Sequence, residues 1–204
     1  MKKRTLITGI IFLIIFLIIA LFNSMGSLDC LNDFVYSSII HLQTPTMTII
    51  MRIITRLGSR ILLASFCILL LIFPKVVIKD KVTILMAVGG AAIISIISKY
   101  IFLIERPNIL RLVEATGYSF PSNHSTAAMA LYTIFLLLIL DRAKSTKAKT
   151  IAKCFFIIPV LVGLSRIYLG VHYFSDVIAG WSLGIGVSLI VYYISKDTCK
   201  LKES

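Results

Sequence analysis

Six long runs of apolar residues constrain this chain most, because each is suited to cross a membrane as a helix. The runs cover about 6–22, 61–78, 82–99, 125–140, 151–164 and 177–195. A spanning helix needs about 20 predominantly apolar residues, and lysines near the ends of the shorter runs can extend their ammonium groups to the interface. We therefore predict an all-α bundle of six membrane spans, forming a single integral membrane domain over residues 1–204.

The composition supports a membrane protein and excludes several other classes. Of the 204 residues, 58% are apolar and 15% are charged, whereas a soluble domain has roughly 45–50% and 25% respectively. A soluble chain of this length cannot bury so much apolar surface. The four cysteines, Cys30, Cys67, Cys154 and Cys199, show no paired spacing. Neither a disulfide framework nor a zinc site is therefore indicated.

The charge distribution predicts an orientation in the membrane. The chain carries 21 Lys and Arg against 9 Asp and Glu, but the basic residues are spread between apolar runs, so we expect no nucleic-acid partner. With the N-terminus placed inside, 14 basic residues fall in cytoplasmic segments and 7 fall outside. Cytoplasmic loops are enriched in Lys and Arg. We expect a multi-pass protein of the plasma membrane with both termini cytoplasmic, and no obligate protein partner.

A segment outside the six runs has the pattern of an amphipathic helix. Thr44 and Pro45 form a helix start, with threonine as cap and proline at the first helical position. One face then carries Met47, Ile50, Met51, Ile54 and Leu57, and the other carries Thr48, Arg52, Thr55, Arg56 and Ser59. The pattern predicts a helix at the extracytoplasmic membrane surface. A helix packed over the bundle with its arginines in water fits equally well, and the role of Arg52 and Arg56 stays open.

Three basic residues gather at the predicted outer ends of the spans. Lys99 and Arg106 are seven residues apart, about two helical turns, so they can share a helical face. Arg166 comes from a different segment. Charges are costly near a bilayer, and the arginine fork suits phosphate oxygens while lysine adds a point charge. Three converging cations therefore indicate a site for a multiply charged anion.

Two further groups of polar residues lie at the same end. Ser122, Asn123 and His124 directly precede an apolar helix, whose first N–H groups form an anion site that Ser122 can also cap. His172 and Asp176 are four residues apart, so the carboxylate can orient the imidazole as a nucleophile. His124 is then available as a general acid. Each feature alone is commonly structural, but their position on one side of the membrane favours a shared function.

These residues form three blocks with fixed spacing. The blocks are Lys99-x6-Arg106-Pro107, Pro121-Ser122-Asn123-His124 and Ser165-Arg166-x5-His172-x3-Asp176. They resemble the signature of the type 2 phosphatidic acid phosphatase superfamily, in the six-span branch that acts on lipid phosphates. The small size is similar to the bacterial phosphatidylglycerophosphate phosphatase B group. Asn123 stands where the family usually has glycine, which would allow a left-handed backbone that asparagine tolerates next best.

The resemblance implies a role for each site residue. Phosphate would be bound by Lys99, Arg106, Ser122, Arg166 and the backbone amides of Asn123 and His124. His172 would attack phosphorus and form a phosphohistidine, with Asp176 orienting and stabilising its ring. His124 would protonate the departing lipid alkoxide and then activate water. The resemblance implies no metal or other cofactor.

The resemblance also implies a membrane lipid phosphate as substrate. We rank phosphatidylglycerophosphate first and keep undecaprenyl diphosphate as the alternative, which an outward-facing site favours. Phosphatidic acid and sphingoid phosphates are further candidates. A phosphotransferase that uses the same site, and a non-catalytic six-span lipid-binding or transport protein, are the rival functions.

Overall fold

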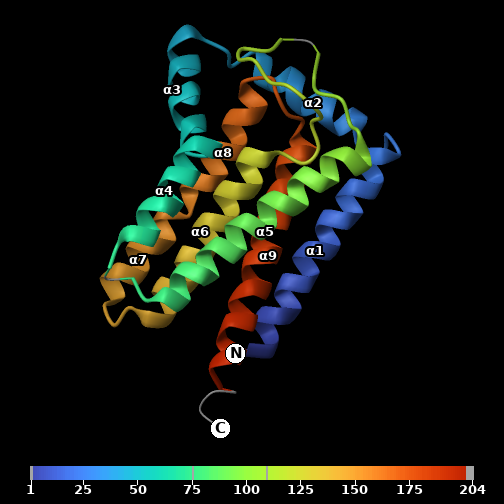
Figure 1. The fold of residues 1–204 in the computed structure, drawn as a ribbon. Helices are drawn as coiled ribbons and strands as arrows, with labels where there is room; N and C mark the ends of the chain where they lie inside the picture. Colours follow the sequence, from blue (N-terminus) through green and yellow to red (C-terminus); the bar gives the residue numbers. More distant parts are fainter. Residues whose placement is uncertain (1, 75, 109, 201–204) are drawn as a thin grey trace.

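A computed structural model describes residues 2–74, 76–108 and 110–200, and this part of the chain folds into helices without a strand (Figure 1). The helices are α1 (Lys2–Ser24), α2 (Asp29–Ile40), α3 (Pro45–Arg56), α4 (Arg60–Ile72), α5 (Ile78–Phe102), α6 (Asn123–Arg142), α7 (Thr146–Phe155), α8 (Ile157–Tyr168) and α9 (Phe174–Lys200). Six helical stretches are long and apolar enough to span a membrane. The predictions of an all-α fold and of six spans are therefore confirmed.

Two of the spans differ from the predicted runs. The predicted run 61–78 lies too late in the sequence, because α4 ends at Ile72 and the candidate span is Pro45–Ile72, which joins α3 to α4. Pro74 disfavours a helical backbone at the residue before it, and Phe73 is extended. The run 151–164 was too short, because α7 and α8 together form the span Thr146–Tyr168. The other four runs lie inside α1, α5, α6 and α9.

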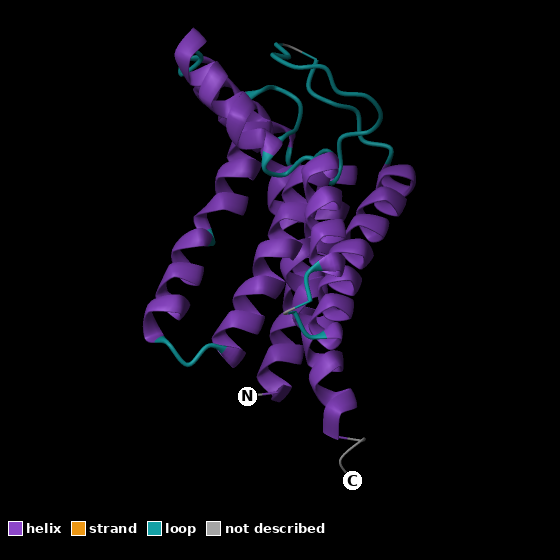
Figure 2. Ribbon diagram, turned by 60° about the vertical axis from the view of Figure 1, so that its left-hand side comes forward, coloured by secondary structure: helices purple, strands orange, loops and turns teal. Residues whose placement is uncertain are grey.

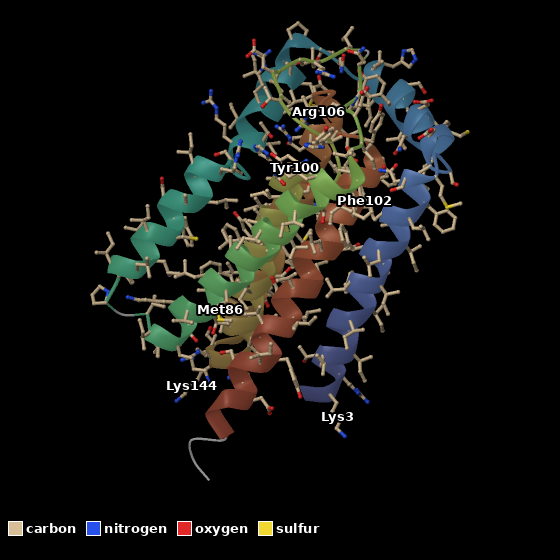
Figure 3. The ribbon with its side chains drawn as sticks, turned by 45° about the vertical axis from the view of Figure 1, so that its right-hand side comes forward. Lys3, Met86, Tyr100, Phe102, Arg106 and Lys144 are labelled. Atoms are coloured by element: carbon tan, nitrogen blue, oxygen red, sulfur yellow. The ribbon has the colours of Figure 1, made fainter. Side chains whose placement is uncertain are left out.

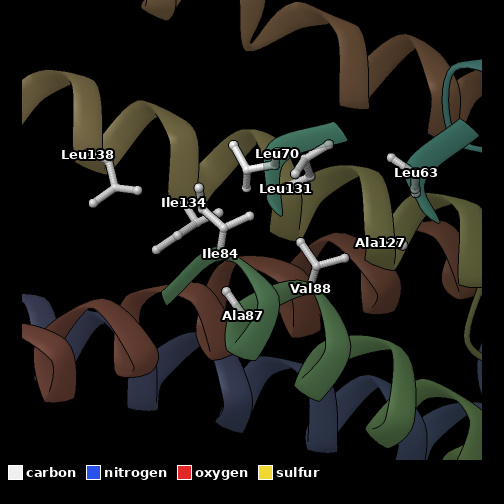
Figure 4. Packing of buried hydrophobic residues seen from close by; sticks show 9 residues of the cluster. All are labelled: Leu63, Leu70, Ile84, Ala87, Val88, Ala127, Leu131, Ile134 and Leu138. Atoms are coloured by element: carbon white, nitrogen blue, oxygen red, sulfur yellow. The ribbon is translucent and has the colours of Figure 1, made fainter. Parts of the chain in front are cut away.

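Helices α6 and α9 form the centre of the bundle, with α1 and α5 packed against α9 (Figure 1). Close packing of α6 and α9 depends on small residues. A Cβ on Gly184 would stand 2.6 Å from the Thr126 carbonyl oxygen, so only glycine lets the two backbones approach this closely. A second buried cluster joins α4, α5 and α6 around Ile84, Leu131 and Ile134 (Figure 4).

The long loops gather at one end of the bundle. Figure 2 shows the segment after α5 and the turns around α2 and α3 at this end, opposite the start of α1 and the last turns of α9. Arg106 lies at the loop end, whereas Lys3 and Lys144 lie at the other (Figure 3). The three predicted blocks therefore meet where the chain has the most irregular backbone.

Helix α3 is amphipathic, and the threonines of its polar face point inward while its arginines are exposed. Thr44 is the predicted cap, and its hydroxyl accepts from the Met47 N–H. The Thr48 hydroxyl lies 3.2 Å from the Tyr168 hydroxyl of α8, and Thr55 is buried. On the apolar side, Ile50 is 44% exposed. Both threonines therefore pack on α8, which agrees with the alternative of a helix packed over the bundle with its arginines in water.

Candidate active site

His172 lies in the turn between α8 and α9 and is 2% exposed. Its Nδ1 is 3.3 Å from Oδ2 of Asp176, which lies in the first turn of α9 and is fully buried. The predicted pair thus forms, although His172 precedes the helix. Gly170 makes this turn possible, because its φ is 70° and a Cβ there would stand 2.1 Å from the Leu110 carbonyl oxygen.

The hydrogen bonds of His172 fix its tautomer. Its Nε2 lies 3.2 Å from Nη1 of Arg106. A guanidinium can only donate, so Nε2 carries the lone pair and Nδ1 carries the proton that faces Asp176. Burial first, and then the positive charge of Arg166, lower the pKa of His172 well below its usual 6.5. The ring is therefore neutral, with a lone pair directed at a cation.

Asp176 connects two of the three blocks and one residue outside them. Its Oδ2 accepts from the Tyr173 N–H at 2.9 Å and from the Ser119 hydroxyl. Ser119 also lies 3.3 Å from Nδ1 of His172. The Asp176 carbonyl accepts from the Ser122 N–H at 3.1 Å, which holds the start of α6 against the start of α9. The carboxylate is therefore held by the same contacts that assemble the site.

Lys99 and Arg106 meet through a loop and not along one helical face. Lys99 is in the last turn of α5, which ends at Phe102, and Leu103 caps it in the left-handed conformation with φ 52°. The Lys99 ammonium donates to the carbonyl oxygen of Ser119 at 2.8 Å. The Arg106 guanidinium donates to the carbonyl oxygens of Gly117 at 2.8 Å and Val171 at 2.7 Å. The helical spacing argument was wrong, because the helix ends between the two cations.

Arg166 lies on α8 and is 6% exposed. Its Nη1 donates to the Thr55 hydroxyl of α3 at 2.8 Å. Its Nε is buried and has no hydrogen-bond partner among the residues that the structure describes. A buried donor without a partner is costly, so this N–H is suited to an anion that enters the site.

The second block forms the start of α6, but in a different way from that predicted. Ser122 is the N-cap residue, yet its hydroxyl accepts from the Ser125 hydroxyl at 2.9 Å and caps no backbone N–H. Asn123 is the first helical residue and is not left-handed, and its Oδ1 accepts from the Ser95 hydroxyl of α5 at 2.6 Å. His124 is half-buried and lies within electrostatic range of Arg166. The first N–H groups of α6 therefore remain open to a ligand.

The structure thus brings all eight predicted site residues to one end of the bundle and adds others. Ser119, Thr55 and Arg60 were not predicted: Ser119 contacts the His–Asp pair, Thr55 holds Arg166, and the charge of Arg60 acts on His124. The polar face of the amphipathic segment contained Thr55, but its partner was not readable from spacing. In the described part of the chain, no three His, Cys, Asp or Glu side chains group as metal ligands.

An apolar groove lies between α4, α6 and α7. Its volume is about 680 Å³, and it is lined by Leu57, Leu62, Leu63, Phe66, Leu131, Tyr132, Phe135, Leu136, Ile139, Ala143, Ala148, Ile151, Ala152 and Phe155. Along α6 the lining extends from Leu131 to Ala143, which is about 18 Å at 1.5 Å per residue. The groove is therefore about as long as a leaflet of the bilayer core is thick.

Comparison with known proteins identifies the family. A model of the PAP2 superfamily, the type 2 phosphatidic acid phosphatases, matches residues 80–199, which contain all three blocks. This chain belongs to the PAP2 superfamily. The predicted resemblance is thereby confirmed.

Relatives and solved structures cover most of this PAP2 chain. It is 27% identical over 181 residues to phosphatidylglycerophosphatase B of Bacillus subtilis, and the match covers 86% of this chain and 89% of that protein. It is 30% identical over 189 residues to an undecaprenyl-diphosphatase of Sulfolobus acidocaldarius, covering 88% and 87%. The crystal structure of a transmembrane PAP2-type phosphatidylglycerolphosphate phosphatase from Bacillus subtilis matches with a TM-score of 0.81 at 25% identity, covering 95% and 96%.

Proposed function

We propose that this PAP2 protein is an integral membrane phosphatase that removes the terminal phosphate of phosphatidylglycerophosphate through a phosphohistidine intermediate. The observation that carries the proposal is the neutral His172, whose lone pair lies 3.2 Å from an Arg106 donor while Asp176 holds the opposite ring nitrogen. An imidazole nucleophile beside fixed cations is suited to attack on a phosphate. Membership of the PAP2 superfamily supports the same chemistry.

In the first step, phosphate oxygens bind Lys99, Arg106, Arg166 and the first N–H groups of α6. By accepting from Nη1 of Arg106, a phosphate oxygen frees the lone pair on Nε2 of His172. Nε2 then attacks phosphorus, and the P–O bond to the lipid breaks with its electron pair on oxygen. His124 gives that oxygen a proton, and the lipid alcohol leaves. The cations stabilise the charge that spreads over the phosphoryl oxygens.

In the second step, a water molecule replaces the lipid alcohol. His124, now neutral, takes a proton from this water, and the water oxygen attacks phosphorus. The P–N bond breaks, its electron pair returns to Nε2 of His172, and inorganic phosphate leaves. Throughout both steps Asp176 stabilises the positive charge on the ring and Ser119 holds the carboxylate.

The apolar groove supports a lipid substrate whose tail stays in the membrane. It begins at Leu57, one residue before Gly58, and Gly58 lies against His124. A hydrocarbon chain in the groove would therefore hold the phosphate at the site. The split of basic residues supports cytoplasmic termini with the site on the extracytoplasmic side, because Arg106 lies opposite Lys3 and Lys144 (Figure 3).

Undecaprenyl diphosphate is the second candidate substrate. The undecaprenyl-diphosphatase relative favours it, and so does an outward-facing site. Rates of phosphate release from phosphatidylglycerophosphate and from undecaprenyl diphosphate, measured side by side in detergent, decide between them. A higher kcat/KM on the diphosphate would overturn our ranking of the substrates and leave the proposed chemistry intact.

The nucleophile is tested by trapping the intermediate. We expect a lipid labelled with ³²P in the terminal phosphate to label the protein, with the label stable to an alkaline quench. The variant His172→Ala should lose both labelling and turnover, whereas His41→Ala, an exposed histidine at the end of α2, should keep both. Full turnover by purified His172→Ala would show that the nucleophile is assigned wrongly. Transfer of label to a lipid acceptor would instead indicate a phosphotransferase.

A further inference from the structure

The junction between α3 and α4 connects the phosphate site to the apolar groove. A Cβ on Gly58 would stand 3.5 Å from the Cβ of His124 and 2.4 Å from Cγ1 of Val162, so this segment packs directly on the site. Leu57 and Leu62, on either side of it in the sequence, line the groove. The junction therefore contacts the site at His124 and the groove at Leu57 and Leu62.

Arg60 is the charged residue on the α4 side of this junction, and Arg56 is the one on the α3 side. Arg60 is the first residue of α4 and is exposed, and its side chain makes no hydrogen bond or ion pair with the residues that the structure describes. Its positive charge acts on both Lys99 and His124. Like charges near one another are unfavourable until an anion comes between them. Arg60 is thus a cation near the site that has no anionic partner among the residues that the structure describes.

A single bound phosphate does not neutralise the positive charge of Arg60. Lys99, Arg106, Arg166 and His124, which carries the proton for the leaving group, are countered by Asp176, and His172 is neutral, so these residues carry a net charge of about +3. A phosphate monoester carries about −1.5 to −2 at pH 7. One terminal phosphate therefore does not exceed the positive charge of the inner site, and the charge of Arg60 is matched only by a further anionic group on the substrate.

We propose that Arg60 binds a second phosphate group of the substrate, located between the phosphate being cleaved and the lipid tail. The substrate class is then a lipid with two phosphate groups in series. The phosphodiester of phosphatidylglycerophosphate and the inner phosphate of a polyprenyl diphosphate both supply the required charge. This inference rests on the proposed function and adds a preference over lipids with one phosphate, such as phosphatidic acid.

The test compares kcat/KM on lipids with two phosphates and with one. We expect Arg60→Gln to lower kcat/KM about tenfold on phosphatidylglycerophosphate, on polyprenyl diphosphate, or on both, which corresponds to about 1.4 kcal/mol. On phosphatidic acid with the same acyl chains the loss should be at least five times smaller. Arg60→Lys should recover part of the loss, because a point charge remains. Arg56→Gln, an exposed arginine at the end of α3, is the matched control and should change neither rate.

Comparing phosphatidylglycerophosphate with polyprenyl diphosphate shows which kind of second phosphate binds Arg60. The lipid on which Arg60→Gln causes the larger loss has the phosphate spacing that places its second group at Arg60. Equal losses on phosphatidic acid and on both of these lipids, an equal loss in Arg56→Gln, or no loss at all would overturn the proposal.

Binding to an inactive background separates this proposal from the proposed function. In His172→Ala, calorimetry in detergent should show that Arg60→Gln raises the Kd of phosphatidylglycerophosphate or of a polyprenyl diphosphate about tenfold. The Kd of phosphatidic acid should rise at least five times less. If the wild type releases phosphate from no lipid, the proposed function fails, and this binding comparison still decides the role of Arg60. Equal Kd changes on all these lipids would refute it.

Discussion

Replacing Asp176 with asparagine isolates the charge of the carboxylate from its geometry. Three donors converge on Oδ2: the Tyr173 N–H, the Ser119 hydroxyl and Nδ1–H of His172. The other oxygen, Oδ1, is buried without a partner among the described residues. Asparagine must therefore place its carbonyl oxygen at the Oδ2 position and its amide NH₂ at the Oδ1 position. In Asp176→Asn, His172 keeps its tautomer, but the negative charge next to its Nδ1 is lost.

The distance between Nδ1 of His172 and Oδ2 of Asp176 sets the size of the expected effect on kcat. With Nδ1 at 3.3 Å from Oδ2, a full positive charge on the ring would gain about 5 kcal/mol from the carboxylate at an effective dielectric constant of roughly 20. If roughly half of that charge has developed in the transition state, the loss is about 2–3 kcal/mol, or on the order of 10²-fold in kcat. We expect KM to change much less, because the ring is neutral when substrate binds.

The assay is phosphate release from a lipid phosphate in detergent, with kcat and KM measured separately. Glu114→Gln, an exposed carboxylate in the loop after α5, is the matched control and should keep both values. The buried amide NH₂ of Asp176→Asn lacks a partner and costs about 1–3 kcal/mol of stability, so circular dichroism must establish that the variant is folded at the assay temperature. A kcat within fivefold of wild type, or a loss confined to KM, would refute the role of the charge.

Three further predictions follow from the geometry of the site. The pKa of His172 lies well below 6.5 because burial disfavours the charged ring, so the ring stays neutral as the pH falls through 6.5; an NMR titration of the ring, assigned with His172→Ala, should have its midpoint below that value. Thr55→Val removes the acceptor of Nη1 of Arg166, and we expect kcat/KM to fall about five- to tenfold, whereas Thr55→Ser should restore it. Gly170→Ala places a Cβ 2.1 Å from a carbonyl oxygen at a positive φ, and we expect it to destabilise the fold by about 2–4 kcal/mol, measured as a lower Tm in detergent; an unchanged Tm would contradict the backbone argument.

The membrane class and the number of spans could be predicted from the amino-acid sequence alone, as could the residues that gather at the candidate site. Each span is recognised from its own length and apolar character, because the bilayer acts as solvent for every helix separately. Such a chain contains few charged residues, so candidate functional residues can be recognised among them in the sequence. Lys99, Arg106, Arg166, His172 and Asp176 could therefore be named before their positions were known.

The further side chains of the site can be recognised only once the helices are packed together. Ser119 comes from a loop and Thr55 from α3, and each contacts residues far away in the sequence. Arg60 comes from the start of α4, and its charge acts on His124. A helix in a membrane is apolar on most sides, so its sequence shows weakly which face meets the bundle. The burial of Thr55 and the position of Arg60 at the start of α4 follow from the packing of α3 on α8 and of α4 on α6, which no local pattern specifies.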